Sequence, residues 1–383
     1  MKIAFIGQKG IPSIGGGVER YVEDLSTHLV AYGHEAIVYT RKHYTPEHRV
    51  NFKGVKLVSL PSINTKHLDA ITHTIVATIH ASLHKVDLVH YQMIGAALMS
   101  WLPKLLNPRV RIVSTLQSKD YEHQKWGRFA RFMLLLGEKM MCYFSDEIIV
   151  VTKSMRKYVR QKYNRDSVYI PNGALLHPRA GADRLKNFGL TKDSYIVSVS
   201  RIVRHKGLGY LISAYKNLKT DKKLVIVGGG AFTDDYVSEL KTFAESNPNI
   251  IFTGSQTGEN LAQLYENAYV FVQPSESEGL SLALLEAMAR RKACLVSDIQ
   301  ENKEAVQETG FVFKNKNIDD LTEQLNYVLN NPAEVKTKGL EARQRIEEVF
   351  NWSAIAKNMI KVYKSVSTEK QPWLVLKKKY SIN

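Results

Sequence analysis

Short apolar runs alternate with longer amphipathic stretches along most of the chain. The short runs predict buried strands, and apolar positions that recur every three or four residues predict helices between them. In the first half the expected strands fall at 3–7, 37–40, 55–60, 88–91, 111–116 and 147–152, with helices at 18–32, 67–84, 94–106 and 126–144. Strands separated by helices of this length are typical of βαβ units and a parallel sheet.

The alternation starts again after the turn-forming segment Ile170-Pro171-Asn172-Gly173, which indicates a domain junction. Strands are expected at 195–201, 223–227, 250–253, 269–273, 294–297 and 311–313, helices at 209–218, 236–246, 261–267 and 282–290, and a long helical region at 319–366 with interruptions near 331–332 and 351–352. We therefore expect an α/β protein with two facing, doubly wound, Rossmann-like domains, residues 1–171 and 172–351. Residues 352–383 then supply a helix that packs back toward the first domain and a basic tail. Ligands of such folds bind beyond the carboxyl ends of the strands.

The composition is that of a globular protein, with 44% hydrophobic and 23% charged residues among 383. Only Cys142 and Cys294 occur, so no disulfide framework is implied and a reducing compartment fits. The first residues lack the apolar region and cleavage site of a signal peptide, and no apolar run reaches the length of a membrane span. A cytoplasmic protein is expected.

Basic residues exceed acidic ones mainly in the first half of the chain. Residues 1–172 hold 24 Lys and Arg against 13 Asp and Glu, which is a net charge of +11, and the remaining 29 against 24 add +5 to reach the total of +16. A basic surface attracts nucleic acid, anionic lipid or phosphorylated substrates, and charge alone does not choose among them. No recognisable nucleic-acid-binding module accompanies the charge, so no nucleic-acid partner is expected.

Two carboxylates eight positions apart stand out in the run 274–289. Glu278 precedes Gly279 at the loop that opens a helix, where free backbone N–H groups favour an anionic or hydroxylated ligand. Glu286 lies inside that helix, and burying it is costly unless a partner satisfies its charge. Its apolar neighbours there are Leu282, Leu285 and Met288. A helix start flanked by two acids suits a polyol attached to a phosphate, as in a nucleotide sugar.

Each acid also has a purely structural interpretation. Glu278 stabilises the start of a helix through the helix macrodipole. Glu286 pairs with Arg290 one turn later on the same helix. An exposed pair of that kind contributes only about 0.2–0.5 kcal/mol, and it does not account for a glutamate surrounded by Leu, Ala and Met.

Further candidate residues follow the first strand of each expected domain. Gly15-Gly16-Gly17 lies where glycine lets the backbone approach a ligand and where a helix N-terminus favours a phosphate, although a mobile turn has the same composition. Arg201 and Lys206 flank the corresponding turn of the second domain. Two cations there neutralise a diphosphate, and two solvated basic residues are the alternative. Gly228 follows another strand of that domain and either relieves crowding or lines the nucleotide site.

Metal-binding patterns are absent from the sequence. The two cysteines are far apart, and neither a His-Glu-x-x-His nor an Asp-x-Asp motif occurs. We therefore expect no metal and no cofactor.

Taken together, these segments resemble glycosyltransferase family 4, whose members have the two-domain GT-B fold. The resemblance covers nearly the whole chain and rests on the glycine loop, the junction 168–173, the Arg201…Lys206-Gly207 spacing and the signature Glu278-x7-Glu286. It implies a retaining, metal-independent enzyme that transfers a sugar from a nucleotide sugar to a lipid-linked or oligosaccharide acceptor. The first residues are also similar to those of bacterial rhamnosyltransferase-like members, which implies synthesis of a cell-surface polysaccharide such as capsule, exopolysaccharide or O-antigen.

The resemblance also assigns roles to individual residues. It implies catalytic roles for Glu278 on the donor sugar and for Arg201 and Lys206 on the donor diphosphate. Glu286 resembles the acid that binds the ribose hydroxyls. The other donor-binding positions that it implies are Gly16, Gly17, Gly228, Gly279, Leu280 and Ser281.

One position departs from the family pattern. Many members carry His or Asp just beyond the strand that matches 111–116, where this chain has Gln117. Glutamine forms hydrogen bonds to a hydroxyl but cannot act as a general base at neutral pH. This favours front-face displacement, in which the departing diphosphate receives the acceptor proton. Gln117 and Asp120 are the acceptor-side candidates, and Glu122 and His123 follow closely.

Two segments are candidates for contact with a membrane. Residues 126–136 are both basic and apolar; similar enzymes dock a helix of this character on anionic lipid, and a core helix with solvated cations is the alternative. The tail 373–380 is a second candidate. With the charge of the first half, they predict peripheral association with the inner face of the cell membrane.

Two other functions stay open at this point. One is a sugar-nucleotide epimerase, which is also built on two α/β domains but needs no second substrate. The other is an inactive nucleotide-sugar-binding subunit of an envelope assembly.

Overall fold

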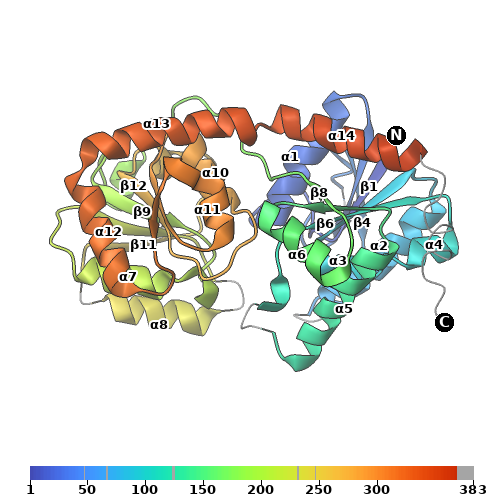
Figure 1. Ribbon diagram of the computed structural model, residues 1–383, viewed down its shortest axis with the longest axis horizontal. Helices are drawn as coiled ribbons and strands as arrows, with labels where there is room; N and C mark the ends of the chain where they lie inside the picture. The colour runs from blue at the N-terminus through green and yellow to red at the C-terminus, as the bar shows by residue number, and fades with distance from the viewer. Residues whose placement is uncertain (47, 66–67, 123–125, 231–232, 246, 369–383) are drawn as a thin grey trace. The chain divides into compact units, whose positions relative to one another are not determined.

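The computed structural model describes all residues except 47, 66–67, 123–125, 231–232, 246 and 369–383. The chain forms two compact units, shown in Figure 1. Unit 1 consists of residues 1–172 together with 352–383, and unit 2 consists of residues 173–351. Each unit is an α/β structure with its own sheet.

The sheet of unit 1 follows the order β3-β4-β2-β1-β5-β6-β7-β8. Its strands are β1 (Lys2–Ile6), β2 (Glu35–Arg41), β3 (Asn51–Phe52), β4 (Val55–Leu60), β5 (Leu88–Gln92), β6 (Arg111–Leu116), β7 (Glu147–Val150) and β8 (Val168–Tyr169). All pairs are parallel except β3 with β4. The chain order reverses at β1 and β5, and in such sheets the reversal is the place where ligands bind beyond the strand ends.

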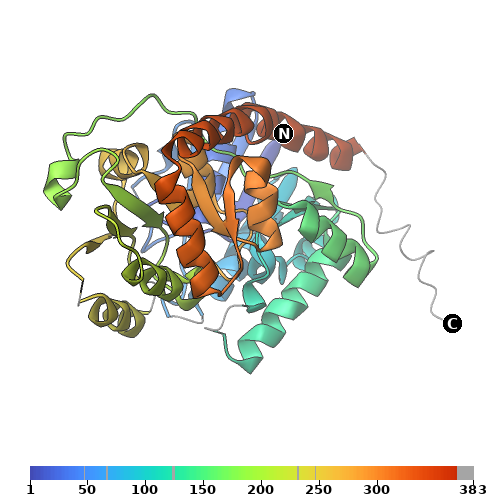
Figure 2. The same ribbon diagram turned by 60° about the vertical axis from the view of Figure 1, so that its left-hand side comes forward.

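The helices of unit 1 lie on both faces of this sheet (Figures 1 and 2). They are α1 (Gly17–Ala31), α2 (Asp69–Leu83), α3 (Met93–Ala97), α4 (Leu102–Leu106), the 3₁₀ turn η1 (Asp120–Glu122), α5 (Arg128–Phe144), α6 (Lys153–Tyr163) and α14 (Trp352–Thr368). The single helix expected at 94–106 was wrong, because the chain forms α3 and α4 instead. Pro103 lies in the first turn of α4, where a missing N–H costs nothing, whereas the interior of a longer helix excludes it.

The C-terminal helix α14 packs against unit 1, as the sequence predicted. Its Trp352 ring lies 5.6 Å from that of Tyr21 on α1. Its Tyr363 hydroxyl lies 2.7 Å from Nδ1 of His90, whose Nε2 lies 2.6 Å from the Thr115 hydroxyl. His90 is fully buried on β5, so these two bonds satisfy a polar ring in the core and fix α14 to the sheet.

The sheet of unit 2 is entirely parallel and follows the order β11-β10-β9-β12-β13-β14. The strands are β9 (Tyr195–Val199), β10 (Lys223–Val227), β11 (Ile250–Gly254), β12 (Val270–Gln273), β13 (Cys294–Ser297) and β14 (Phe311–Phe313). This is the Rossmann order, and its reversal falls between β9 and β12. The expected fold class, two doubly wound parallel α/β domains with a helix returning to the first, is confirmed.

The helices of unit 2 cover both faces of its sheet (Figure 2). They are η2 (Leu185–Phe188), η3 (Arg204–Lys206), α7 (Leu208–Lys216), α8 (Asp234–Ala244), α9 (Gly258–Glu266), α10 (Leu282–Ala289), α11 (Gln300–Val306), η4 (Gln307–Thr309), α12 (Ile318–Asn330) and α13 (Pro332–Val349). Among the described residues of the chain, no helix combines the length and the apolar character needed to cross a bilayer.

Candidate functional site

The two turns that carry the predicted donor residues begin at the carboxyl ends of β9 and β12, which are neighbours in the sheet of unit 2. Lys206 ends η3 in the turn after β9. Glu278 lies in the loop between β12 and α10. Because β9 and β12 flank the reversal of strand order, both side chains lie at the position where doubly wound domains bind their ligands.

The structure brings Lys206 and Glu278 into direct contact. The Lys206 Nζ lies 2.5 Å from Oε1 of Glu278, and the two side chains are only 13% and 9% exposed. The Ser275 hydroxyl donates to the same oxygen at 2.7 Å. Ion pairs this well shielded are coupled strongly, and removing one partner leaves an uncompensated charge that costs about 3–5 kcal/mol. A ligand that binds either residue therefore changes the environment of the other.

A chain of buried polar side chains supports the loop that carries Glu278. The Ser297 hydroxyl donates to the Ser275 carbonyl at 2.5 Å, and Asn302 donates to the Ser297 hydroxyl at 3.0 Å. Gln273 donates to Asn302 at 2.8 Å and accepts from Ser281, the cap of α10, at 2.7 Å. Buried networks whose members bond to one another are rigid, so these residues fix the start of α10. Nothing in the sequence pattern marked Gln273, Ser297 or Asn302 as members of this network.

Glu276 joins the same loop to the turn that carries Lys206. Its backbone N–H donates to the His205 carbonyl at 2.8 Å. Its carboxylate accepts from the Tyr210 hydroxyl at 3.0 Å and lies 2.9 Å from the Lys316 Nζ. Glu276 thus has its own partners. In the sequence, its place two residues before Glu278 was the only indication that it belongs to the same loop structure.

Two glycines allow the loops above β9, β10 and β12 to approach one another. Gly207 has a φ of +69°, and a Cβ there would lie 1.9 Å from the Pro274 carbonyl oxygen. Gly228 has a φ of +148°, and a Cβ there would lie 1.8 Å from the Ser200 carbonyl oxygen. Both positions require glycine, since a side chain would collide with backbone. Close packing is therefore one role of Gly228, as one of the two sequence interpretations proposed.

Arg201, the second predicted cation, is exposed to solvent. Its guanidinium forms no hydrogen bond or ion pair within the described part of the chain. It therefore differs from Lys206, which is already paired with an acid.

The structure corrects the expectation of a buried Glu286. This residue on α10 is half-buried, while Leu285 and Met288 beside it are buried. Burial raises the pKa of Tyr265 well above its usual value, and the nearby Glu286 carboxylate raises it further. The proposed structural partner, Arg290, lies 3.6 Å from Glu266 on α9. Most of α10 is covered, since it contacts β12, β13, α9 and α13, and Glu286 lies on the part of the helix where this cover is incomplete. The apolar neighbours in sequence did not reveal that gap.

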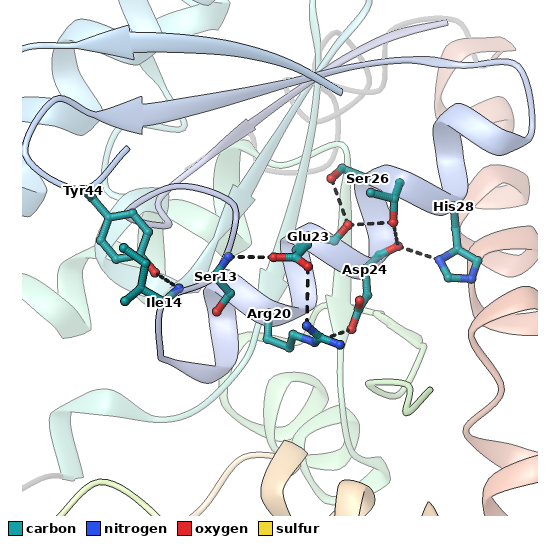
Figure 3. Close-up of polar contacts among 9 residues, drawn as sticks. Ser13, Ile14, Arg20, Glu23, Asp24, Ser26, His28 and Tyr44 are labelled. Carbon is teal, nitrogen blue, oxygen red and sulfur yellow. Dashed lines mark hydrogen bonds and ion pairs between the residues drawn. The ribbon is translucent and has the colours of Figure 1, made fainter. Parts of the chain in front are cut away.

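The other predicted residues belong to unit 1. Gly16 precedes α1 with a φ of +109°, and Gly17 is the first residue of that helix. The loop before them is held by side chains, as Figure 3 shows. The backbone N–H of Ser13 donates to Glu23 at 2.6 Å, and that of Ile14 donates to the Tyr44 hydroxyl at 2.8 Å. These contacts argue against a freely mobile turn.

Acidic residues of α1 are the anchors of this loop. Glu19 is nearly buried and accepts from the backbone N–H of Lys9 at 3.0 Å. Glu23 also pairs with Arg20 at 3.4 Å, and Asp24 lies 3.1 Å from the same guanidinium. The carboxylates thus accept loop N–H groups and neutralise Arg20, a contribution that the sequence analysis missed.

The acceptor-side candidates follow β6. Gln117 is buried, and its amide donates to Gln92 at the end of β5 over 3.4 Å. Asp120 begins η1 and accepts from the Ser118 hydroxyl at 2.6 Å. They therefore lie next to the strand reversal of unit 1. His123, a further candidate, lies outside the described residues.

Within the described ranges, His, Cys, Asp and Glu side chains form no group of three or more that would hold a metal ion. The expectation that the enzyme uses no metal stays a prediction.

Comparison with known proteins identifies the family. Residues 15–175 match the family model "Glycosyltransferase Family 4", and residues 182–371 match "Glycosyl transferases group 1". The chain is 26% identical to an uncharacterized glycosyltransferase of Methanocaldococcus jannaschii over 95% of this chain and 98% of that one. It is 24% identical to the capsular polysaccharide biosynthesis glycosyltransferase CapM of Staphylococcus aureus, over 63% and 68% of the two chains.

A solved structure confirms the fold. HepE of Anabaena in complex with UDP-glucose superposes with a TM-score of 0.80 at 17% identity, covering 95% of this chain and 100% of that one. The two family models together span both units, and the architecture is the GT-B fold that the sequence predicted. The chain therefore belongs to glycosyltransferase family 4 and is a glycosyltransferase.

Proposed function

We propose that this glycosyltransferase moves a sugar from a nucleotide-sugar donor, with retention of anomeric configuration, to a growing lipid-linked glycan of the cell surface. The observation that carries the proposal is the shielded Lys206–Glu278 pair at the strand reversal of unit 2. A relative named for capsular polysaccharide biosynthesis and a structural neighbour holding UDP-glucose support the glycan context and the class of donor.

The donor binds at the ends of β9 and β12 in this proposal. Lys206 and the exposed Arg201 hold the diphosphate and stabilise the charge that builds on it as the glycosidic bond breaks. Glu278 accepts hydrogen bonds from sugar hydroxyls, and Glu286 accepts them from the ribose. Because Lys206 contacts Glu278 before the donor arrives, diphosphate binding draws the ammonium away and frees the carboxylate for the sugar.

The remaining donor-binding positions offer backbone rather than side-chain groups. The cap of α10 leaves the first N–H groups of that helix beside the sugar and phosphate. These positions are Gly279, Leu280 and Ser281, with Gly228 from the neighbouring loop.

The acceptor binds over unit 1 near Gln117 and Asp120. Gln117 orients an acceptor hydroxyl without removing its proton, because an amide is no base at neutral pH. The departing diphosphate oxygen receives that proton in a front-face displacement. No metal is required, since Lys206 and Arg201 supply the positive charge.

The acceptor is presented at the inner face of the cell membrane, where α5 contacts anionic lipid. Phe129 and Phe132 on this helix are 77% and 60% exposed, and Arg128 and Arg131 beside them are exposed as well. Figures 1 and 2 show the amino-terminal end of α5 projecting beyond the other helices of unit 1. Exposed aromatic rings among cations are typical of a helix that lies in a lipid interface, and they favour lipid contact over the core-helix interpretation for this end of α5. The tail 373–380 lies outside the described residues.

Release of nucleoside diphosphate tests the proposal. Purified protein is incubated with a panel of nucleotide sugars, with and without lipid-linked acceptor, and the anomeric configuration of the product is determined by NMR. We expect release with one donor that depends on the acceptor and gives a retained product. An altered free nucleotide sugar formed without acceptor would identify an epimerase, and donor binding without turnover would identify an inactive subunit.

A further inference from the structure

A cluster of three tyrosines, one lysine and one buried glutamate lies outside the residues assigned above. Glu138 on α5 is fully buried. Its Oε1 accepts from the Tyr158 hydroxyl at 2.7 Å, the Lys162 Nζ at 2.9 Å and the Tyr163 hydroxyl at 2.5 Å. The Lys162 Nζ also lies 5.1 to 5.4 Å from the ring centroids of Tyr121, Tyr158 and Tyr163. A buried carboxylate is tolerated because a cation and two hydroxyls compensate it.

One member of this cluster reaches the acceptor-side turn. The Tyr121 hydroxyl lies 2.7 Å from that of Tyr158. Since Tyr158 gives its proton to Glu138, Tyr121 is the donor in this contact. Tyr121 is the middle residue of η1, directly after Asp120. A continuous chain of hydrogen bonds therefore runs from α5 through α6 to the turn that carries the acceptor-side candidates.

The direction of these bonds fits the chemistry of the hydroxyls. Burial raises the pKa of Tyr158, and the bond that its hydroxyl donates to Glu138 raises it further, so this hydroxyl keeps its proton. Bonds to an ionised acceptor are also stronger than bonds between neutral groups. The Glu138 carboxylate thus acts through Tyr158 to orient the Tyr121 ring.

We infer that Glu138, Tyr158 and Tyr121 are positioning residues for acceptor binding: they fix η1 on α5 and α6 so that Asp120 and Gln117 meet the acceptor. This inference rests on the proposed function for the identity of the substrate but not for the positioning itself. It also gives α5 two linked roles, because the helix proposed to contact lipid is the one from which the acceptor-side turn is held.

The chain offers a matched pair of variants. Tyr158→Phe and Tyr163→Phe each remove one hydroxyl that donates to the same Glu138 oxygen, but only Tyr158 is bonded to η1. The Tyr158 hydroxyl also accepts from the Lys162 Nζ at 2.6 Å, so its loss costs more stability than loss of the Tyr163 hydroxyl. A merely stabilising cluster raises exchange across unit 1 in both variants and does not single out η1. A positioning cluster responds to the first at η1 and leaves η1 unchanged in the second.

The test has two readouts on the full-length protein. Amide hydrogen exchange of residues 118–122 is expected to rise about five- to tenfold in Tyr158→Phe and to stay at the wild-type rate in Tyr163→Phe, as loss of one hydrogen bond implies. In transfer assays, Tyr158→Phe is expected to raise the KM for acceptor by about the same factor. The KM for donor and donor hydrolysis without acceptor are expected to stay unchanged.

Equal exchange of 118–122 in the two variants would overturn the inference, whatever the enzyme transfers. So would an unchanged KM for acceptor in Tyr158→Phe, or a rise in the donor KM that matches it. A wild-type protein that transfers no sugar contradicts the proposed function instead, and the exchange measurement still decides whether the tyrosine chain positions η1. Tyr121→Phe serves as a second variant, because it removes the other hydroxyl of the same hydrogen bond. The double variant Tyr121→Phe/Tyr158→Phe is expected to show the same exchange at residues 118–122 as Tyr158→Phe alone.

Discussion

Replacing Gly207 by alanine tests the arrangement of the two loops at the reversal of unit 2. With a φ of +69°, an alanine there costs about 1–2 kcal/mol in backbone conformation. Its Cβ would also lie 1.9 Å from the Pro274 carbonyl oxygen, and backbone cannot yield as the end of a flexible side chain does. The strain is relieved only if the turn after β9 and the loop after β12 move apart.

Such a movement separates Lys206 from Glu278, whose contact is 2.5 Å. A displacement of about 1 Å in a positioned group costs on the order of a hundredfold in rate. We therefore expect Gly207→Ala to lower turnover about a hundredfold and to reduce the thermal midpoint. The assays are nucleoside diphosphate release under saturating substrates and calorimetric unfolding.

Gly209→Ala is the matched control. It lies two residues later in α7, where an added Cβ has only the Leu240 Cδ2 at 3.8 Å as a neighbour. Alanine has a higher helix propensity than glycine by at most about 1 kcal/mol, and Gly209 lies in the first turn of α7, so this variant is expected to keep its activity and lose no stability. Wild-type turnover in Gly207→Ala, or an equal loss in both variants, would refute the reasoning.

Three further outcomes are expected. Ser275→Ala removes one hydrogen-bond donor to Glu278 and is expected to lower turnover about fivefold, while the thermal midpoint changes by no more than a few degrees. Full activity in kinetic assays would contradict this. Phe132→Ser is expected to abolish flotation with anionic vesicles. Phe243→Ser on α8, which changes a ring of unit 2 that is 43% exposed against 60% for Phe132, is expected to leave flotation unchanged. Equal flotation of the two variants would exclude α5 as the lipid contact. Burial lowers the pKa of His90 to about 3, so below pH 6.5 the unfolded chain binds a proton at this residue that the folded chain does not bind. Urea titrations are therefore expected to show a free energy of unfolding that falls from about pH 6.5 toward pH 3. A flat profile would show that His90 is not buried as described.

The fold was largely predictable because its strands are short apolar runs, and several, such as β5, β12 and β13, are buried along their whole length. β4, β6, β10, β13 and β14 have the bounds that their apolar runs predicted. α6 and α11 were missed because few of their residues face the core; Met155 and Val159 are the buried apolar positions of α6. Helix 94–106 was overextended because its apolar pattern continues through the break before Pro103.

The candidate site was predictable residue by residue but not as an assembly. Lys206 and Glu278 each carried a signal of residue type and place, yet they are 72 positions apart and meet only because β9 and β12 are neighbours. The buried polar chain beneath them left no trace in the sequence, since nothing in the pattern distinguishes Ser297 at the end of β13 or Asn302 in α11 from other polar residues. Glu286 was misjudged because apolar neighbours in sequence do not fix which side of a helix is covered.

The central claim is that Glu278 acts on the donor sugar during transfer, and Glu278→Gln tests it most directly. Turnover and donor affinity are measured for this variant and for Glu276→Gln, which changes the neighbouring acid of the same loop that pairs with Lys316. By analogy with loss of an oxyanion-hole donor, about 3–4 kcal/mol of barrier, Glu278→Gln is expected to lower turnover by two to three orders of magnitude while donor affinity changes far less. Glu276→Gln is expected to lose no more than about fivefold, as for one hydrogen-bonded contact. Unchanged turnover in Glu278→Gln would contradict the account.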